Sequence, residues 1–344
     1  MTLFGFGTAT VDFRIQTADL GPEYRAKLLA QKTEVMGGGA VANALYQATL
    51  LGGKTEWIGR LGSDGLGDMI IEDLNSHGIG TRHVRRIADA YSPFNLAAYA
   101  GEGRRRLGGF LLPNCLGGVT DDDIEAWVQA LCADDWILVE VGEIPLPTVL
   151  AFCRAAKSSV DPAAEPTAPG DRPAPREGSG PRIVVDVDLD PIRQCVGGDA
   201  PTIDAILALA DVILPNREAM ESLYPGYDAA ALAAELAAKY AVPVVVTAGD
   251  QGCSYARGEL RSVPPGNRAG RVAHVPAAKV DVVDTVGAGD AFHGAFAWAL
   301  ANGEGLDSAV RVATICAAAN CRTFGARSGM IGIKELDEKM GGVT

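Results

Sequence analysis

Short apolar runs rich in β-branched residues alternate along this chain with stretches of helical period. The helical period is clear from Val41 to Ala48, where apolar residues recur at i, i+3, i+4 and i+7 before Gly52-Gly53 ends the pattern. A second helix is expected over 229–240. This alternation predicts an α/β protein with a parallel sheet covered by helices. The clearest strands are 55–59, 136–141, 183–187, 212–214 and 242–247.

Residues 91–118 depart from this alternation, because their strand-like residues flank a Gly-Glu-Gly turn at 101–103. That pattern is typical of an antiparallel hairpin. Strand-like residues near 9–16 are expected to join it. An antiparallel hairpin does not fit inside a parallel sheet, so we predict a small antiparallel β lid built from about 9–37 and 91–118.

A Pro- and Gly-rich polar segment interrupts the second half of the pattern. Residues 161–182 contain six Pro and three Gly. This composition favours a disordered surface insertion, with bounds of 158–182. An interdomain linker is the alternative. Strand–helix alternation continues on both sides of the segment, so we expect one α/β domain over 1–344.

Charge and cysteine content exclude several classes of protein. The 344 residues carry 43 Asp and Glu against 30 Lys and Arg, a net charge of −13, which argues against a nucleic-acid partner. No run of 18 apolar residues and no signal-peptide pattern is present, so we expect a cytoplasmic protein without a membrane partner. The seven Cys include no C-x-x-C pair and read as reduced thiols.

The most informative motif is residues 280–300, VDVVDTVGAGDAFHGAFAWAL. An apolar run ends at Asp284, small residues follow, and helical spacing begins after them. The first backbone N–H groups of such a helix have no partner and lie at its positive end, which favours a bound anion. Asp290 in the first turn is a candidate acceptor for a substrate proton. For G-A-G-D alone, an ordinary acidic first turn explains the pattern equally well.

The longer string 284–292, DTVGAGDAF, closely resembles the C-terminal signature of the PfkB, or ribokinase-like, family of carbohydrate kinases. Further matches to that family follow in chain order and span nearly the whole sequence. They are an Asp on the first strand of the lid (Asp12), G-G-x-x-x-N (38–43), G-x-D-x-x-G (62–67), T-x-G-x-x-G (247–252) and a closing loop (325–329).

The resemblance implies a three-layer α/β/α fold and ATP-dependent transfer of the γ-phosphoryl group to a sugar hydroxyl. It implies that Asp290 accepts the hydroxyl proton. The N–H groups at Gly287, Ala288 and Gly289 would form the anion hole. His293 beside them is interpreted as structural. The residues that would hold the sugar hydroxyls are Asp12, Gly39 and Asn43.

The resemblance also implies a nucleotide site lined by Thr247, Gly249 and Gly252, with Asn216 and Asn320 as further candidates. The family often has N-x-x-E where an acid helps to hold Mg²⁺. Here Asn216 is followed by Glu218 and Glu221, with Ala219 between them, and we favour Glu218. Asp284 resembles the residue of the family's monovalent-cation loop, which makes K⁺ a candidate cofactor. The lids of relatives often pair, which implies a homodimer.

Three functions compete. A sugar kinase comes first. A nucleoside kinase of the same fold would need more aromatic residues in the lid than Tyr91, Phe94 and Tyr99 supply. A non-catalytic sugar or nucleotide sensor would not need Asp290. The Asp186-Val187-Asp188 segment and the residues after Asp290 resemble fructokinase-type and sulfofructose-kinase-type members, which favours a ketose or ketose derivative.

Overall fold

The computed structural model describes the chain except for residues 18–29, 101–104, 112–113, 160–179, 259–270 and 342–344. Its centre is a nine-stranded sheet in the order β13-β12-β11-β10-β9-β8-β1-β4-β5. The pairs from β11 to β5 are parallel, and β12 and β13 join the edge antiparallel. The predicted mostly parallel sheet is confirmed.

All five predicted strands are present. They are β4 (Thr55–Gly62), β8 (Trp136–Val141), β9 (Arg182–Val187), β10 (Val212–Pro215) and β11 (Val244–Thr247). The sequence patterns do not single out the four remaining strands, each of which has four residues. These are β1 (Leu3–Phe6), β5 (Val84–Ile87), β12 (Cys253–Ala256) and β13 (Val272–Val275).

Helices cover both faces of this sheet and enclose two apolar cores. The first core lies under α3 (Asp121–Val128), α4 (Leu146–Ser158), α5 (Ala200–Leu209) and α6 (Ala229–Tyr240). The second lies under α1 (Ala40–Leu50), α2 (Gly65–Ser76), α8 (Ala288–Ala301), α9 (Leu306–Asn320) and α10 (Ile333–Gly341). The three helices expected from the sequence, α1, α6 and α8, are present. None of the described helices is long and apolar enough to cross a bilayer.

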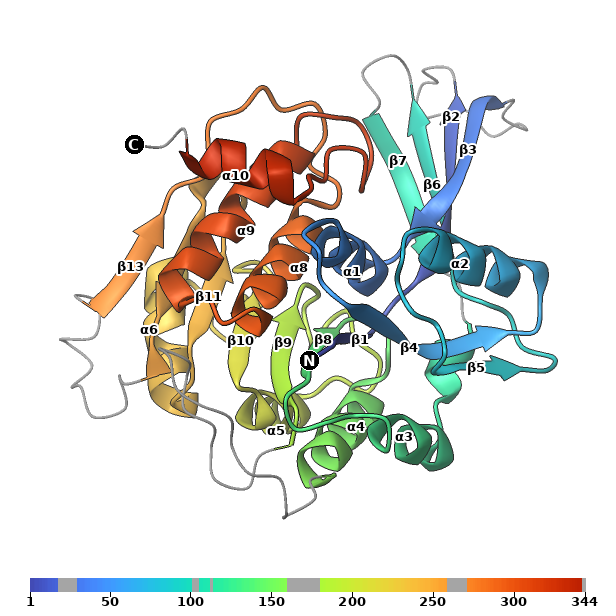
Figure 1. Ribbon diagram of the computed structural model, residues 1–344, viewed down its shortest axis with the longest axis horizontal. Helices are drawn as coiled ribbons and strands as arrows, with labels where there is room; N and C mark the ends of the chain where they lie inside the picture. Colours follow the sequence, from blue (N-terminus) through green and yellow to red (C-terminus); the bar gives the residue numbers. More distant parts are fainter. Residues whose placement is uncertain (18–29, 101–104, 112–113, 160–179, 259–270, 342–344) are drawn as a thin grey trace.

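A second, smaller sheet stands at one side of the main one (Figure 1). It has the order β3-β2-β6-β7, with β2 (Thr10–Thr17), β3 (Ala30–Gly38), β6 (Phe94–Ala100) and β7 (Arg105–Leu111). The predicted hairpin is the antiparallel pair β6–β7, and β2–β3 is antiparallel as well. The pair β2–β6 is parallel. The Gly-Glu-Gly turn at 101–103 and most of the Pro-rich insertion lie outside the described residues.

Several candidate site residues follow the carboxyl ends of neighbouring strands. Asp188 follows β9, Asn216 follows β10, and Thr247 ends β11. These ends lie at one edge because the strands are parallel, and this edge is where open α/β sheets bind ligands. Asn216 and Thr247 form a further parallel bridge beyond the strands.

Candidate active site

Helix α8 begins at the predicted anion pocket. The N-cap residue of this helix is Gly287, whose φ of +78° is a left-handed conformation that favours glycine. The N–H of Val286 donates to Asp284 and that of Ala288 donates to the carbonyl of Thr285. The N–H groups of Gly287 and Gly289 have no acceptor among the described residues. Of the three N–H groups expected to form the anion hole, that of Ala288 is therefore in use, and those of Gly287 and Gly289 remain for an anion.

Asp290 lies in the first turn of α8 and accepts a 2.7 Å hydrogen bond from the side-chain amide of Asn43. Asn43 is buried on α1. Burial, followed by the negative charge of Asp188, raises the pKa of Asp290 to about 8. This environment suits a proton acceptor, because a carboxylate of raised pKa binds a proton more strongly.

Arg327 connects this pair to the small sheet. Its Nε donates to the side-chain oxygen Oδ1 of Asn43 at 2.5 Å, and its Nη1 donates to the Asp73 carboxylate on α2 at 2.6 Å. The positive charge of Arg327 also acts on Asp12, which lies on β2 and accepts from Thr10 Oγ1 at 2.8 Å. Burial nevertheless raises the pKa of the Asp12 carboxyl. Arg327 lies in the closing loop expected at 325–329, but the sequence assigned it no role in the site.

The remaining predicted sugar residue, Gly39, lies directly before α1. Its φ is +93°, and a Cβ there would lie 2.6 Å from the carbonyl oxygen of Thr8. The neighbouring Gly38 lies against the Asp12 carboxyl group. Asp12, Gly39 and Asn43 are therefore gathered where β2, β3 and α1 meet.

A buried ion pair lies beneath the start of α8. His293 and Asp186 are 2.7 Å apart, and both are almost fully buried. Burial opposes a charged imidazole, but the Asp186, Asp188 and Asp290 carboxylates outweigh it and raise the pKa of His293 to about 9. Burial and Asp186 also raise the pKa of Asp188, to about 6.

Asp186, Asp188 and His293 each offer one atom to a cluster within 4.8 Å. A metal ion there would have to displace the proton of the imidazolium, so the trio fits an internal ion-pair network better than a metal site. His293 was interpreted as structural from the sequence. Its contact with Asp186 and its charge beside Asp290 show that it also belongs to the electrostatics of the site.

Two further buried acids lie close by and were not predicted. Glu140 accepts from the backbone N–H and the hydroxyl of Thr8, at 2.7 and 2.8 Å. The Oε2 atom of Glu143 is buried and has no hydrogen-bond partner among the described residues. Burial and neighbouring carboxylates, including Glu140 and Asp12, raise the pKa of Glu143. An unpaired buried carboxyl group beside Asp12 is suited to binding a hydroxyl.

The predicted nucleotide residues lie along the edge of the main sheet. Thr247 bridges Asn216, and Gly249 and Gly252 follow it in a tight turn. A Cβ on Gly249 would meet no atom within 4 Å, so open space lies in front of this residue. This part of the edge can therefore accept a ligand without rearrangement.

The two metal candidates differ in their contacts. The Glu221 carboxylate accepts from Arg217 at 3.0 Å and from the N–H of Gly226 at 3.2 Å. The exposed Glu218 has no carboxylate partner among the described residues, and its N–H donates to Asn216 Oδ1 at 2.9 Å. Hard divalent cations prefer free carboxylate and amide oxygens. The pair Asn216 and Glu218 therefore fits Mg²⁺ better than Glu221 does.

Asp284 and Asn320 hold the loops around the start of α8. Asp284 accepts from the N–H groups of Val286 and Gly325 at 3.1 and 3.0 Å. The buried Asn320 donates to the carbonyls of Val286 and Ala326 and accepts from Gly329. This geometry uses the Asn320 side chain inside the protein, so it gives no support to a nucleotide contact. The cation role of Asp284 stays a prediction.

The site thus combines a buried carboxyl group of raised pKa, free N–H donors at a helix start and buried polar groups close to the small sheet. The model of the pfkB family of carbohydrate kinases matches residues 3–114 and 186–331. The chain belongs to this family. A ribokinase of Bacillus subtilis (strain 168) is 26% identical over 336 residues, which cover 96% of this chain and 97% of the relative. The family expected from the motifs is confirmed.

Solved structures have the same fold. Arabidopsis thaliana ribokinase complexed with ribose and ATP superposes with a TM-score of 0.74 at 22% identity, covering 98% of this chain and 97% of that one. A nucleoside kinase of Burkholderia thailandensis in complex with inosine gives a TM-score of 0.72 at 17% identity, covering 99% and 97%. The three-layer ribokinase-like fold with its smaller sheet is therefore confirmed.

The family shows the class of reaction. The chain is a kinase that transfers a phosphoryl group to an alcohol, and its relatives phosphorylate sugars or nucleosides. Kinases of this family use ATP. The substrate of this chain and the role of each site residue go beyond what the family membership shows.

Proposed function

We propose that this protein is an ATP-dependent sugar kinase in which Asp290 accepts the proton of the attacking hydroxyl. The observation that carries the proposal is the placement of Asp290 beside the free N–H groups of Gly287 and Gly289, with Asn43 bound to its carboxylate. A hydroxyl held between these groups lies next to both its proton acceptor and the phosphoryl group that it attacks.

Each remaining group has a distinct task in the proposal. The Gly287 and Gly289 N–H groups neutralise charge that develops on the phosphoryl oxygens. Asp12, Gly39 and Asn43 orient the sugar, and Glu143 is a further hydroxyl acceptor. Thr247, Gly249 and Gly252 line the nucleotide. Asn216 and Glu218 would hold Mg²⁺, which when bound neutralises phosphate charge.

We favour a ketose or ketose derivative as the acceptor, on the resemblance of the Asp186-Val187-Asp188 segment to ketose-kinase members. A nucleoside kinase is the second candidate, supported by the fold shared with the inosine-bound nucleoside kinase and by the edge-to-face pair of Tyr99 and Phe324, 6.2 Å apart. A non-catalytic sensor is the third.

A substrate panel separates these candidates. Purified protein is incubated with ATP and Mg²⁺ and with ketoses, aldoses or nucleosides, and ADP formation is measured. We expect ADP with at least one ketose and a phosphorylated sugar as product. Turnover confined to nucleosides would support the second candidate, whereas binding without any turnover would support the sensor.

The activity should depend on the ionisation of Asp290. Since its pKa is about 8, kcat/KM should rise about tenfold for each pH unit below that value and level off above it. Replacing Asp188 with Asn removes the nearest negative charge, so it should lower the pKa of Asp290 and move the rising limb to lower pH. Profiles of kcat/KM against pH for wild type and variant test this. Asp337→Asn, at an exposed position, is the control. If the rising part of the Asp188→Asn profile lay at the same pH as in wild type, the proposed influence of Asp188 on the pKa of Asp290 would be wrong.

The two acids after Asn216 should differ in their effect on Mg²⁺. Replacing Glu218 with Gln should raise the Mg²⁺ concentration needed for half-maximal activity by about tenfold, because one carboxylate is lost from the metal's surroundings. Glu221→Gln is the matched control and should leave it nearly unchanged, since that carboxylate is bound to Arg217. Initial rates measured over a range of Mg²⁺ concentrations give this value for both variants. A larger increase for Glu221→Gln than for Glu218→Gln would assign the metal to Glu221.

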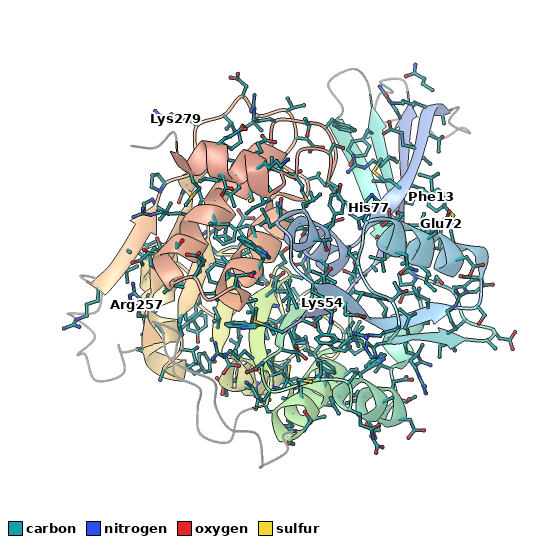
Figure 2. The ribbon with its side chains drawn as sticks, viewed as in Figure 1. Phe13, Lys54, Glu72, His77, Arg257 and Lys279 are labelled. Atoms are coloured by element: carbon teal, nitrogen blue, oxygen red, sulfur yellow. The ribbon has the colours of Figure 1, made fainter. Side chains whose placement is uncertain are left out.

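We also propose that the small sheet closes over the sugar as a lid and pairs two subunits. Phe13 and Arg14 are neighbours on β2 and therefore lie on opposite faces of the small sheet, and Figure 2 shows Phe13 near α2. On the face that carries Phe13, Val35 of β3 is 46% exposed. Light scattering of the purified protein should give the mass of a dimer. The Val35→Glu variant should give a lower mass, because it places a charge on the face proposed to pair. A monomeric wild type would end this part of the proposal.

A further inference from the structure

The inner face of the small sheet carries a row of polar side chains that extends beyond the proposed sugar site. Asp12, Arg14 and Gln16 alternate along β2 and therefore share one face. Two residues along a strand span about 7 Å, so Arg14 lies one step further out than Asp12. Across the ladder, Arg14 pairs with Glu34 of β3 and with Ala97 of β6.

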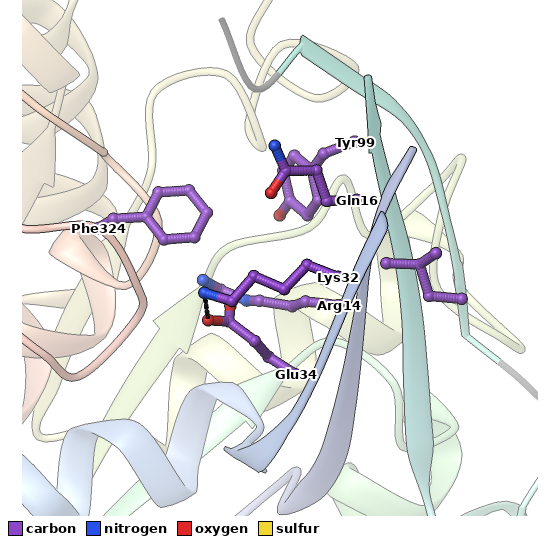
Figure 3. A pocket seen from close by; sticks show the side chains of 7 residues that line it. Arg14, Gln16, Lys32, Glu34, Tyr99 and Phe324 are labelled. Carbon is purple, nitrogen blue, oxygen red and sulfur yellow. Dashed lines mark hydrogen bonds and ion pairs between the residues drawn. The ribbon is translucent and has the colours of Figure 1, made fainter. Parts of the chain in front are cut away.

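A small cavity lies in front of this row (Figure 3). Arg14, Gln16, Lys32, Glu34 and Tyr99 approach it from the sheet, and Phe324 approaches it from the facing loop. The Phe324 ring lies over the Arg14 guanidinium, 5.1 Å from ring centre to Cζ. The cavity therefore lies between the small sheet and the loop that follows α9.

The charged side chain of Arg14 is buried, and its neighbours, the Asp12 carboxyl group and the Phe324 ring, satisfy it only in part. Its side chain is 5% exposed, and its Nη1 atom has no hydrogen-bond partner among the described residues. The neighbouring Lys32 and Glu34 pair with each other at 2.5 Å, so Glu34 already has a cation. A buried guanidinium nitrogen without an acceptor is costly, and a bound anion would remove that cost.

The cavity lies near the proposed sugar site. A Cβ built on Gly325 would lie 3.5 Å from Arg14 Nη1, so this nitrogen lies against the loop that Asp284 holds beside the start of α8. Arg14 and Arg327 both act electrostatically on Asp12. The order of groups from the reacting end outward is therefore Asp290, Asn43, Asp12 and Arg14.

We infer that this cavity binds an anionic group of the sugar, at the end distal to the hydroxyl that is phosphorylated. The inference rests on the proposed function and narrows its substrate class to acidic sugars. The planar guanidinium of Arg14 can donate two parallel hydrogen bonds to a carboxylate, phosphate or sulfonate. A neutral sugar has no group that would match the Arg14 charge.

The test compares D-fructose with its analogues bearing a terminal carboxylate, phosphate or sulfonate, and D-glucose with D-glucuronate. In wild type, kcat/KM should be higher for at least one anionic analogue than for its neutral parent by at least about tenfold. Arg14→Gln should lower kcat/KM for that analogue by about 10- to 100-fold, mainly through KM, and should change the neutral sugar by less than about threefold. Arg14→Lys keeps the charge and should recover part of the loss.

Arg257→Gln is the matched control, because Arg257 is a surface arginine on the side of the molecule away from the small sheet (Figure 2). It should leave all these values unchanged. Calorimetric binding of each sugar without ATP gives a second readout, so binding to Arg14 is tested even where no sugar is turned over.

The failures of the two proposals are distinguishable. A wild type that prefers the neutral sugars, or an Arg14→Gln variant that loses neutral and anionic sugars equally, would overturn the anion site and leave the sugar kinase standing. Arg14-dependent binding of an anionic sugar without ADP formation from any sugar would keep the anion site and overturn the proposed function. The analogue with the highest kcat/KM or affinity identifies which anion is recognised.

Discussion

Replacing Asp290 with Asn is expected to lower kcat by at least about 100-fold while leaving the fold intact. Asn has the same shape but cannot accept the proton of the attacking hydroxyl. Its side-chain oxygen can still accept from Asn43, which donates to Asp290 at 2.7 Å in the native protein. The loss should therefore appear in kcat rather than in substrate binding. Steady-state kinetics with the sugar identified by the panel measure it.

Two controls test whether the loss of activity comes from the chemistry and not from the fold. The exposed Asp337→Asn should have wild-type kinetics, and the melting temperature of Asp290→Asn should not fall below that of wild type. It is expected to rise slightly, because removing a carboxylate whose pKa burial has raised relieves unfavourable desolvation. Near-wild-type turnover in Asp290→Asn would remove Asp290 from the chemistry and shift attention to Asp188.

Much of the fold could be predicted from local pattern. The central strands β8 to β11 are mostly apolar, and β8 (Trp136–Val141) begins and ends where the sequence pattern predicts. The strands β12 and β13 at one end of the sheet could not be recognised, because Ser254 and His274 interrupt these four-residue strands with polar side chains. Strands this short depend on their neighbours in the sheet and not on their own sequence.

The candidate site could be predicted only where its residues lie in a motif. Asp290 and Asn43 were assigned from separate motifs, and the structure joins them by a hydrogen bond across α8 and α1. Arg14 and Glu143 lie in none of the motifs, and Arg327 lies in the closing loop 325–329 without a role that the motif assigns to it. Their importance comes from burial and from contacts between segments far apart in the chain, neither of which a single sequence displays.

The net charge of −13 bears on how the protein can bind the phosphates of ATP. A strongly acidic chain repels ATP at long range, so phosphate binding has to come from local groups. The free N–H groups at the start of α8 supply part of it without adding a charged side chain. The backbone conformation that aims them is therefore as important as Asp290 itself.

Replacing Gly287 with Ala should disrupt that conformation. A Cβ at this position would lie 2.2 Å from the carbonyl oxygen of Ala326, and the φ of +78° disfavours any L side chain. The obstacle is backbone, so the loop at Ala326 would have to move and weaken its 3.0 Å hydrogen bond with Asn320. We expect kcat/KM for ATP to fall by about 100-fold, and the free energy of unfolding to fall by about 1–3 kcal/mol.

Two glycine variants separate the causes. Gly226 has a φ of +76°, but a Cβ there would meet nothing within 4 Å, so Gly226→Ala isolates the cost of the backbone conformation. Gly289→Ala tests the pocket without backbone strain, since its nearest neighbour would be Asp188 Oδ2 at 3.7 Å. Denaturation without ligand should order stability as Gly289→Ala above Gly226→Ala above Gly287→Ala. If Gly287→Ala lost no more stability than Gly226→Ala and kept wild-type ATP kinetics, the start of α8 would not be the phosphate site.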